Sequence, residues 1–265
     1  MLPNVPGREV AGRIDEVGDE VDPGLIGRRV VSHLGATGGG YAELAVAEAS
    51  AVHPVPDLLT DEIAVASIGT GRTAAGVLML TPIGSDDVVV VTAATGGLGA
   101  LLVREARRQG AWVLALAGGA SKVEAARRLG PDAVVDSRSD DVLSAVDAAL
   151  DGRTPTRVYD GVGGELAAGL HRLLSPTGVL TNYTGLDPDA FGGGAEVRSL
   201  LAPDWAERFG GVAALEAEAL ARAADGSRVP LVGAAYPLAE AATAHRDLEG
   251  RRTVGKVVLD ARRPR

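Results

Sequence analysis

Short runs of alternating apolar and polar residues mark the first part of the chain, and such alternation is typical of strands with one buried face. The predicted strands cover residues 10–17, 28–32 and 41–46. Turns rich in Gly, Pro and Asp separate these runs, as expected where a chain reverses direction. Residues 1–64 therefore predict a small sheet or barrel rather than a strand–helix–strand unit.

The pattern changes between residues 65 and 228, where apolar runs alternate with amphipathic stretches. Strands are predicted at residues 88–92, 112–116, 133–136, 157–159 and 179–182. Helices are predicted at residues 100–109, 122–129, 142–150 and 165–174, with a longer one at about residues 204–224. This rhythm predicts an α/β fold in which helices cover both faces of a parallel sheet.

The end of the chain returns to a strand, a helix and a strand, at residues 231–235, 238–248 and 255–260. We expect the last strand to rejoin the first region of the chain. The sequence thus predicts two domains. One consists of residues 1–64 plus 229–265, and the other, residues 65–228, is inserted into it.

Composition and charge exclude several classes of protein. The net charge is −9 and no basic patch offsets it, which argues against a nucleic acid partner. The chain has no cysteine, so it forms neither disulfides nor thiolate zinc sites. No apolar run approaches the about 20 residues of a membrane span, and no signal peptide is recognisable. We therefore expect a cytoplasmic protein with no membrane partner.

Metal binding is not expected either. The chain has four histidines, and they are scattered along it without the spacing of metal ligands. These are His33, His53, His171 and His245.

The segment that gives the clearest indication of a binding site is a glycine-rich turn between a predicted strand and a predicted helix. Four valines at 88–91 precede Thr92-Ala-Ala-Thr-Gly-Gly-Leu-Gly99, and an amphipathic stretch follows. A strand, such a turn and a helix open a dinucleotide-binding unit, in which a pyrophosphate contacts backbone N–H groups at the helix amino terminus. Gly96, Gly97, Leu98 and Gly99 are the candidates for this contact. The alternative is a plain strand–helix turn that binds no nucleotide.

Several further segments, in order along the chain, resemble the medium-chain dehydrogenase/reductase superfamily in its zinc-independent quinone oxidoreductase (zeta-crystallin-like) branch. The matching segments are residues 5–12, 27–30, 39–43, 71–74, 93–99, 160–164 and 255–259. The resemblance implies a Rossmann-type nucleotide domain flanked by a GroES-like β domain. It also implies hydride transfer from NADPH to a quinone, an enone or another small activated carbonyl.

The resemblance assigns further residues to the nicotinamide half of the cofactor. Thr73 matches a family threonine near the nicotinamide, with a hydroxyl cap at a helix start as the alternative. The segment 160–164 would place backbone beside the nicotinamide ribose, with Gly161, Val162 and Gly163 as the binding residues. Tyr183 stands where the family carries an aromatic residue near the cofactor, and ordinary packing explains it equally well.

The adenosine half of the cofactor is assigned from the end of the second strand. NAD-binding proteins usually carry an acid there, which holds the ribose 2′-OH, but residues 111–122 contain none. Ser121 and Lys122 instead resemble a family grip for a 2′-phosphate, which favours NADPH over NADH. A solvated lysine at a helix start is the alternative for Lys122. Ser137 replaces a tyrosine that the family often has.

Other positions depart from the family pattern. Arg8 occupies the position of a histidine in the zinc-dependent relatives. The chain begins at a segment that lies some way into the usual family member, so we expect the first β strands to be missing, either in a fragment or in a short natural protein. A missing strand edge needs cover, which favours a homodimer. No catalytic residue is assigned. The alternative function is a non-redox descendant, such as a small-molecule cyclase, isomerase or binding protein.

Overall fold

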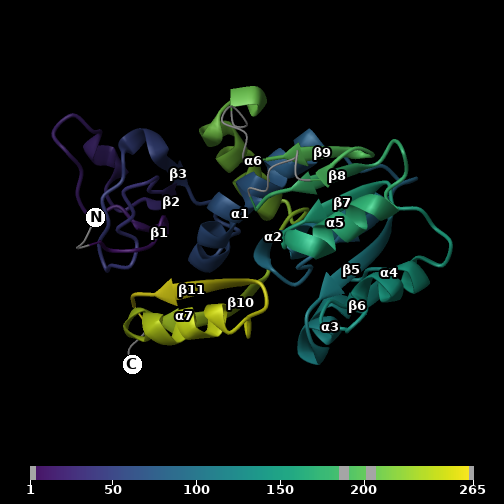
Figure 1. The fold of residues 1–265 in the computed structure, drawn as a ribbon. Helices are drawn as coiled ribbons and strands as arrows, with labels where there is room; N and C mark the ends of the chain where they lie inside the picture. Colours follow the sequence, from purple (N-terminus) through teal and green to yellow (C-terminus); the bar gives the residue numbers. More distant parts are fainter. Residues whose placement is uncertain (1–3, 185–190, 201–206, 263–265) are drawn as a thin grey trace. The chain divides into compact units, whose positions relative to one another are not determined.

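The computed structural model describes residues 4–184, 191–200 and 207–262 (Figure 1). The chain forms two compact units: residues 1–72 with 212–265, called unit 1 below, and residues 73–211, called unit 2. The sequence interpretation placed the two boundaries at 64/65 and 228/229. The units differ from it because parts of two helices, one before residue 73 and one after residue 211, belong to the core of unit 1.

Unit 2 is built on a six-stranded sheet with the order β6-β5-β4-β7-β8-β9, in which every neighbouring pair is parallel. The strands are β4 (Val88–Val91), β5 (Trp112–Ala117), β6 (Ala133–Asp136), β7 (Arg157–Asp160), β8 (Val179–Asn182) and β9 (Glu196–Ser199). The five predicted strands and the parallel sheet are confirmed. The edge strand β9 was not predicted, because its Glu, Arg and Ser residues lack an apolar pattern.

Helices connect these strands and cover the sheet. They are α2 (Gly97–Arg108), α3 (Ala120–Arg127), α4 (Val142–Leu150) and α5 (Gly164–Leu173). One hydrophobic core cluster lies where α4 and α5 pack on the sheet, around Val90, Leu114, Val146 and Leu170. Each such side chain contributes about 1.5–3 kcal/mol when it is fully buried.

The strand order places β4 at the point where the chain changes direction across the sheet. From β4 the chain proceeds through β5 to β6 on one side, and then returns to β7, β8 and β9 on the other. In such a sheet the carboxyl ends of all the parallel strands lie along one edge, and ligands bind where the strand order reverses. The loops that follow β4 and β7 flank this position.

Unit 1 contains a small antiparallel sheet of β1 (Glu9–Arg13), β2 (Arg29–His33) and β3 (Val52–Pro54). The strand predicted at 41–46 is wrong. Leu44 and Val46 are 73% and 95% exposed, so the alternation there does not reflect a buried face. The N–H of Tyr41 instead donates to the carbonyl of Pro6, and β3 takes the place beside β2.

The carboxyl-terminal part of unit 1 forms a second, separate sheet. The strands β10 (Val232–Pro237) and β11 (Lys256–Asp260) pair in parallel, with α7 (Ala241–Glu249) between them in sequence. The last strand therefore returns to the unit that holds the first residues. Within the part of the chain that the structure describes, however, it pairs with β10 and not with the first sheet. An ion pair of 3.2 Å between Lys256 and Glu9 joins the two segments.

Two long helices complete the description: α1 (Asp61–Leu80) and α6 (Val212–Ala224). Short 3-10 helices lie at Pro23–Leu25, Ala49–Ala51, Glu207–Phe209 and Leu238–Glu240. By length and composition α1 is apolar enough to cross a membrane, but a buried core helix passes the same test. Ala64, Ile68 and Val77 of α1 are fully buried in the protein.

A network of ionisable side chains around one buried carboxylate joins four elements of unit 1. Glu216 of α6 is 3% exposed. Its carboxylate accepts from Nη1 of Arg72 in α1 at 2.6 Å and lies 3.0 Å from Nε2 of His53 in β3. The Arg72 Nη2 atom lies 3.1 Å from Nε2 of His33 in β2. Burial and the nearby Arg72 guanidinium lower the pKa of His33. Glu216 is thus the anion that compensates a buried cation.

We expect Glu216→Gln to destabilise the protein by about 3 kcal/mol, because it leaves the buried Arg72 guanidinium without a counter-charge. The measurement is the free energy of unfolding in urea, followed by circular dichroism. Glu124→Gln is the control, since that side chain is 53% exposed in its ion pairs and such pairs contribute about 0–1 kcal/mol. Equal effects of the two substitutions would contradict a structural role for the network.

Candidate functional site

The turn after β4 leads directly into the amino terminus of α2. Ala93 has a φ of 47°, a left-handed conformation that is uncommon outside glycine. Its carbonyl accepts from the N–H of Gly96 at 2.8 Å. Gly96 is the cap residue of α2, and no side chain caps the helix. The first N–H groups of the helix are therefore not satisfied by a side-chain cap, which is the arrangement that binds an anion.

A side chain is excluded at Gly99. A Cβ atom on this residue would lie 2.4 Å from the carbonyl oxygen of Ala93 and 2.9 Å from Cα of Ala94. The helix thus packs tightly against the turn, while Gly97 and Leu98, its first two residues, stay partly exposed. The structure therefore places Gly96, Gly97, Leu98 and Gly99 together at one helix terminus.

The turn after β7 is held by a buried carboxylate. Asp160 is 0% exposed. Its Oδ1 atom accepts from the N–H of Val162 at 3.2 Å, and its Oδ2 atom accepts from the N–H of Gly163 at 2.9 Å. These bonds fix the backbone of the predicted ribose-binding segment, residues 161–163. Asp160 was included in the matching segment 160–164, but its carboxylate was given no role from the sequence, although an Asp directly before a Gly-rich turn is a known turn signal.

The same carboxylate joins this turn to the neighbouring strand ends. Thr92, after β4, donates its hydroxyl to Asp160 at 2.8 Å and accepts from the N–H of Gly161 at 2.8 Å. Asn182, at the end of β8, donates to Oδ2 of Asp160 at 2.8 Å. The segments that follow β4 and β7 are therefore joined by hydrogen bonds to each other and to the end of β8.

Tyr183 lies against the turn after β7. A Cβ atom on Gly161 would be 2.5 Å from Cε2 of Tyr183 and 2.7 Å from its hydroxyl oxygen. This hydroxyl is buried, and it has no hydrogen-bond partner among the described residues. Burial raises the pKa of the phenol, so it is neutral at physiological pH. The packing contact is present, and the proposed contact with a cofactor remains a prediction.

The turn after β5 contains Gly118 and Gly119, and α3 begins at Ala120. Ser121 is exposed and Lys122 is half-buried in the first turn of this helix. Asp136, at the end of β6, accepts from the N–H of Gly119 at 2.7 Å. It also accepts from the N–H of Arg138 at 2.9 Å. These two bonds hold the pKa of Asp136 below its usual range, so the carboxylate is ionised at neutral pH.

The side chain of Arg138 covers this turn. A Cβ atom on Gly118 would lie 3.3 Å from Nε of Arg138, and one on Gly119 would lie 3.1 Å from Nη1. Sequence reasoning considered Ser137 at this place but not its neighbour. A cation two residues after the end of a strand, next to a Gly-Gly turn, is the signal that would have indicated it.

Thr73 lies in the interior of α1, well beyond its start at Asp61. The interpretation of Thr73 as a helix-start cap is therefore wrong, because a capping hydroxyl serves the first free N–H groups of a helix. Its predicted contact with the nicotinamide stays a prediction.

The residues present do not fit a zinc site. The chain contains no cysteine. Within residues 4–184, 191–200 and 207–262, no three His, Asp or Glu side chains come close enough to hold a metal ion. Arg8, which the sequence resemblance aligns with a histidine of the zinc-dependent relatives, carries a cation. No step of the chemistry below uses zinc.

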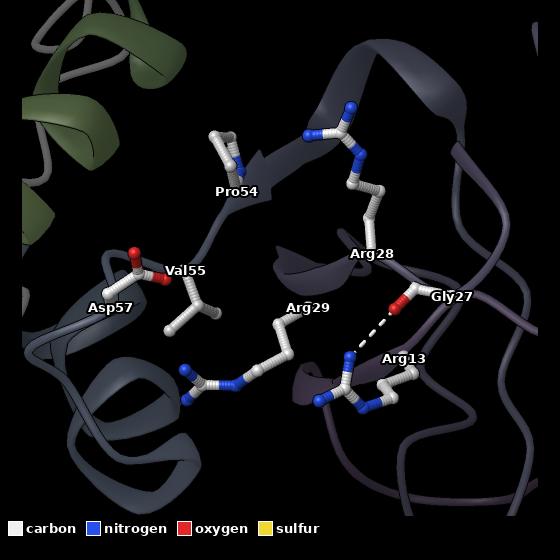
Figure 2. Close-up of a pocket in the computed structure, with 7 residues that line it drawn as sticks. All are labelled: Arg13, Gly27, Arg28, Arg29, Pro54, Val55 and Asp57. Carbon is white, nitrogen blue, oxygen red and sulfur yellow. Dashed lines mark hydrogen bonds between the residues drawn. The ribbon is translucent and has the colours of Figure 1, made fainter. Parts of the chain in front are cut away.

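A pocket of about 410 Å³ lies in unit 1 and contains none of the predicted site residues (Figure 2). Three arginines line it, but two already have partners. Arg13 donates to the carbonyl of Gly27 at 2.8 Å, and Arg29 forms an ion pair of 2.8 Å with Asp61. We assign no ligand to this pocket.

Two family models match the chain. The alcohol dehydrogenase GroES-like domain matches residues 1–57, and the zinc-binding dehydrogenase family matches residues 129–259. Among curated proteins, a quinone oxidoreductase of Pseudomonas aeruginosa is 29% identical over 97% of this chain and 82% of its own length. A 2-haloacrylate reductase of a Burkholderia species is 30% identical over 97% of this chain and 81% of its own length.

A solved structure extends the similarity to the fold. A mycobacterial protein in complex with NADPH superimposes with a TM-score of 0.82 and 33% sequence identity, and the match covers 98% of this chain and 83% of that one. Together with the glycine-rich turn at the sheet edge, these similarities confirm the resemblance seen in the sequence. The chain belongs to the medium-chain dehydrogenase/reductase superfamily and, within it, to the quinone oxidoreductase-like family.

Proposed function

We propose that this protein is an NADPH-dependent, zinc-independent oxidoreductase that reduces a quinone, an enone or another small activated carbonyl. The observation that carries the proposal is the uncapped amino terminus of α2 behind a turn that excludes a Cβ atom at Gly99. The names of the two curated relatives and the NADPH complex of the structural neighbour support it.

In this proposal the backbone provides most of the binding. The N–H groups of Gly97 and Leu98 bind the pyrophosphate, where the positive end of the helix dipole lowers the energy of the anion. The backbone of residues 161–163, fixed by Asp160, supports the ribose next to the nicotinamide. Tyr183 covers the same turn, and Thr73 contacts the nicotinamide.

The bound cofactor supplies a hydride for the acceptor. Reduction of the acceptor also requires a proton, and we assign no side chain to deliver it. The protein's own contribution is to position the reactants, which is worth several kcal/mol of the reaction barrier.

The preference for NADPH is proposed from the turn after β5. The segment from Ala111 to Lys122 has no carboxylate to accept a ribose 2′-OH. Ser121 and Lys122, in the first turn of α3, supply a hydroxyl and an ammonium for a 2′-phosphate. A charge-assisted hydrogen bond of this kind contributes about 1.5–3 kcal/mol.

The first test is a calorimetric titration of the purified protein with NADPH and, for comparison, NADH. Tight binding of NADPH with weaker binding of NADH supports the proposal. A panel of 1,4-benzoquinone, methyl vinyl ketone and 2-chloroacrylate then identifies the acceptor class from NADPH oxidation. If the folded protein binds NADPH but none of these acceptors supports NADPH oxidation, the non-redox alternative is favoured. If the protein binds neither nucleotide, the proposal is contradicted.

We expect Lys122→Ala to raise the KM for NADPH about tenfold and the KM for NADH much less, since only NADPH carries the 2′-phosphate. Steady-state kinetics with each cofactor and a saturating acceptor measure the two values. Arg127→Ala, at the other end of α3, removes the same charge as a control. An equal shift for both cofactors would show that Lys122 does not contact the phosphate.

We expect Gly99→Ala to abolish NADPH binding, because the new methyl group would press on the Ala93 carbonyl and displace the turn. Gly193→Ala is the matched control, since a Cβ atom there meets nothing within 4 Å. Titration calorimetry measures binding, and circular dichroism verifies that both variants are folded. Unchanged affinity in folded Gly99→Ala protein would remove this turn from the proposed site.

A further inference from the structure

The guanidinium of Arg138 lies over the turn at which the proposed site would receive the adenosine ribose. Its Nε and Nη1 atoms come within 3.3 and 3.1 Å of the Cβ positions of Gly118 and Gly119. Both atoms therefore lie beside a stretch of bare backbone. The absence of side chains at these two glycines leaves the space that the guanidinium occupies.

This position is held by the backbone around Asp136. The Oδ1 atom of Asp136 accepts from the N–H groups of both Gly119 and Arg138. One carboxylate oxygen thus ties the turn after β5 to the residue that carries the guanidinium. The side chain of Arg138 needs no large movement to meet a ligand bound at the turn.

Among the described residues, no ion pair includes the Arg138 side chain, and its charge adds to the two backbone hydrogen bonds that lower the pKa of Asp136. By contrast, Arg127, the last residue of the adjoining helix, and Arg128, its cap residue, both pair with Glu124. The Asp136 carboxylate directs its Oδ1 atom to the backbone. A dianionic phosphate at this turn would meet repulsion from Asp136 unless a nearby cation compensates it.

From this geometry we infer that Arg138 selects the 2′-phosphorylated cofactor by binding the 2′-phosphate, against an opposing charge on Asp136. The inference rests on the proposed function and adds to it a specificity-determining pair that acts beside Lys122. The planar guanidinium donates two parallel hydrogen bonds to a phosphate, which an ammonium does not. In this inference, the contact from Arg138 takes the place of the contact that the family's tyrosine would make from the position of Ser137.

The inference predicts opposite effects for two neutral substitutions. Arg138→Gln removes the cation, and we expect it to weaken NADPH binding about tenfold with little change for NADH. Asp136→Asn keeps an oxygen that accepts from both N–H groups but removes the negative charge. We expect it to tighten NADPH binding severalfold and so to raise the ratio of NADPH to NADH affinity.

The experiment is titration calorimetry of the full chain and of the Arg138→Gln, Asp136→Asn and Arg127→Gln variants. The probes are NADPH, NADH, adenosine 2′,5′-bisphosphate and 5′-AMP. The two adenosine probes isolate the 2′-phosphate from the nicotinamide half. Arg127→Gln controls for the loss of one positive charge near α3, and thermal unfolding verifies that each variant is folded.

The outcomes separate the inference from the function on which it rests. The inference is supported if the ratio of NADPH affinity to NADH affinity falls in Arg138→Gln and rises in Asp136→Asn. If wild-type protein binds NADPH but Arg138→Gln loses no more affinity than Arg127→Gln, the inference is wrong and the proposed function stands. Equal losses for NADPH and NADH, or ratios that move in the same direction in both variants, indicate a structural role and also overturn it. Binding of neither dinucleotide by wild-type protein overturns both.

Discussion

The buried carboxylate of Asp160 is the interaction on which the candidate site depends. It receives hydrogen bonds from Thr92, after β4, from Gly163, after β7, and from Asn182, the last residue of β8. Burial of an unpaired carboxylate costs several kcal/mol, so these donors are needed for the fold as well as for the site. Because they converge on one group, the turns after β4 and β7 have fixed positions relative to each other.

A second carboxylate has the same function on the other side of β4. Asp136 accepts from Gly119 and Arg138, and it joins the segments that follow β5 and β6. Each half of the candidate site thus contains an acidic side chain that accepts hydrogen bonds from backbone N–H groups. Hydrogen bonds to a shared carboxylate are a suitable way to hold loops in a chain with 3% aromatic residues, because it has few large side chains that could support loops by packing.

The parallel sheet and its glycine-rich turn are predictable because their signals are local. Four consecutive valines indicate β4, and the glycines after them restrict what the turn can be. The strand at 41–46 was predicted wrongly because alternation is only a sign of burial, and Leu44 and Val46 are exposed. The polar strand β9 was missed for the converse reason: charged residues protect an edge strand from further pairing, and they hide it from a hydrophobic pattern.

The candidate site was predictable in its backbone and less so in its side chains. Gly96 and Gly99 follow from the spacing of glycines in a strand–turn–helix pattern. The bonds of Asp160 to Thr92 and Asn182 join segments that only the sheet order brings together, and so does the position of Arg138 beside Gly119. No short sequence window contains these pairs. The network around Glu216 is a stronger example, since its partner Arg72 is 144 residues away in sequence.

The discontinuity of unit 1 has a consequence for synthesis of the protein. The core of this unit combines Val31 and Ile68 with Leu220 and Ala223, and all of residues 73–211 must be translated between the two groups. A nascent chain emerges from its amino terminus at about 5–20 residues per second. The sequence of unit 2 is therefore completely synthesised before that of unit 1. Until then, Val31 and Ile68 lack the residues against which they pack in the folded protein. The order of translation therefore favours a folding order in which unit 2 folds before unit 1.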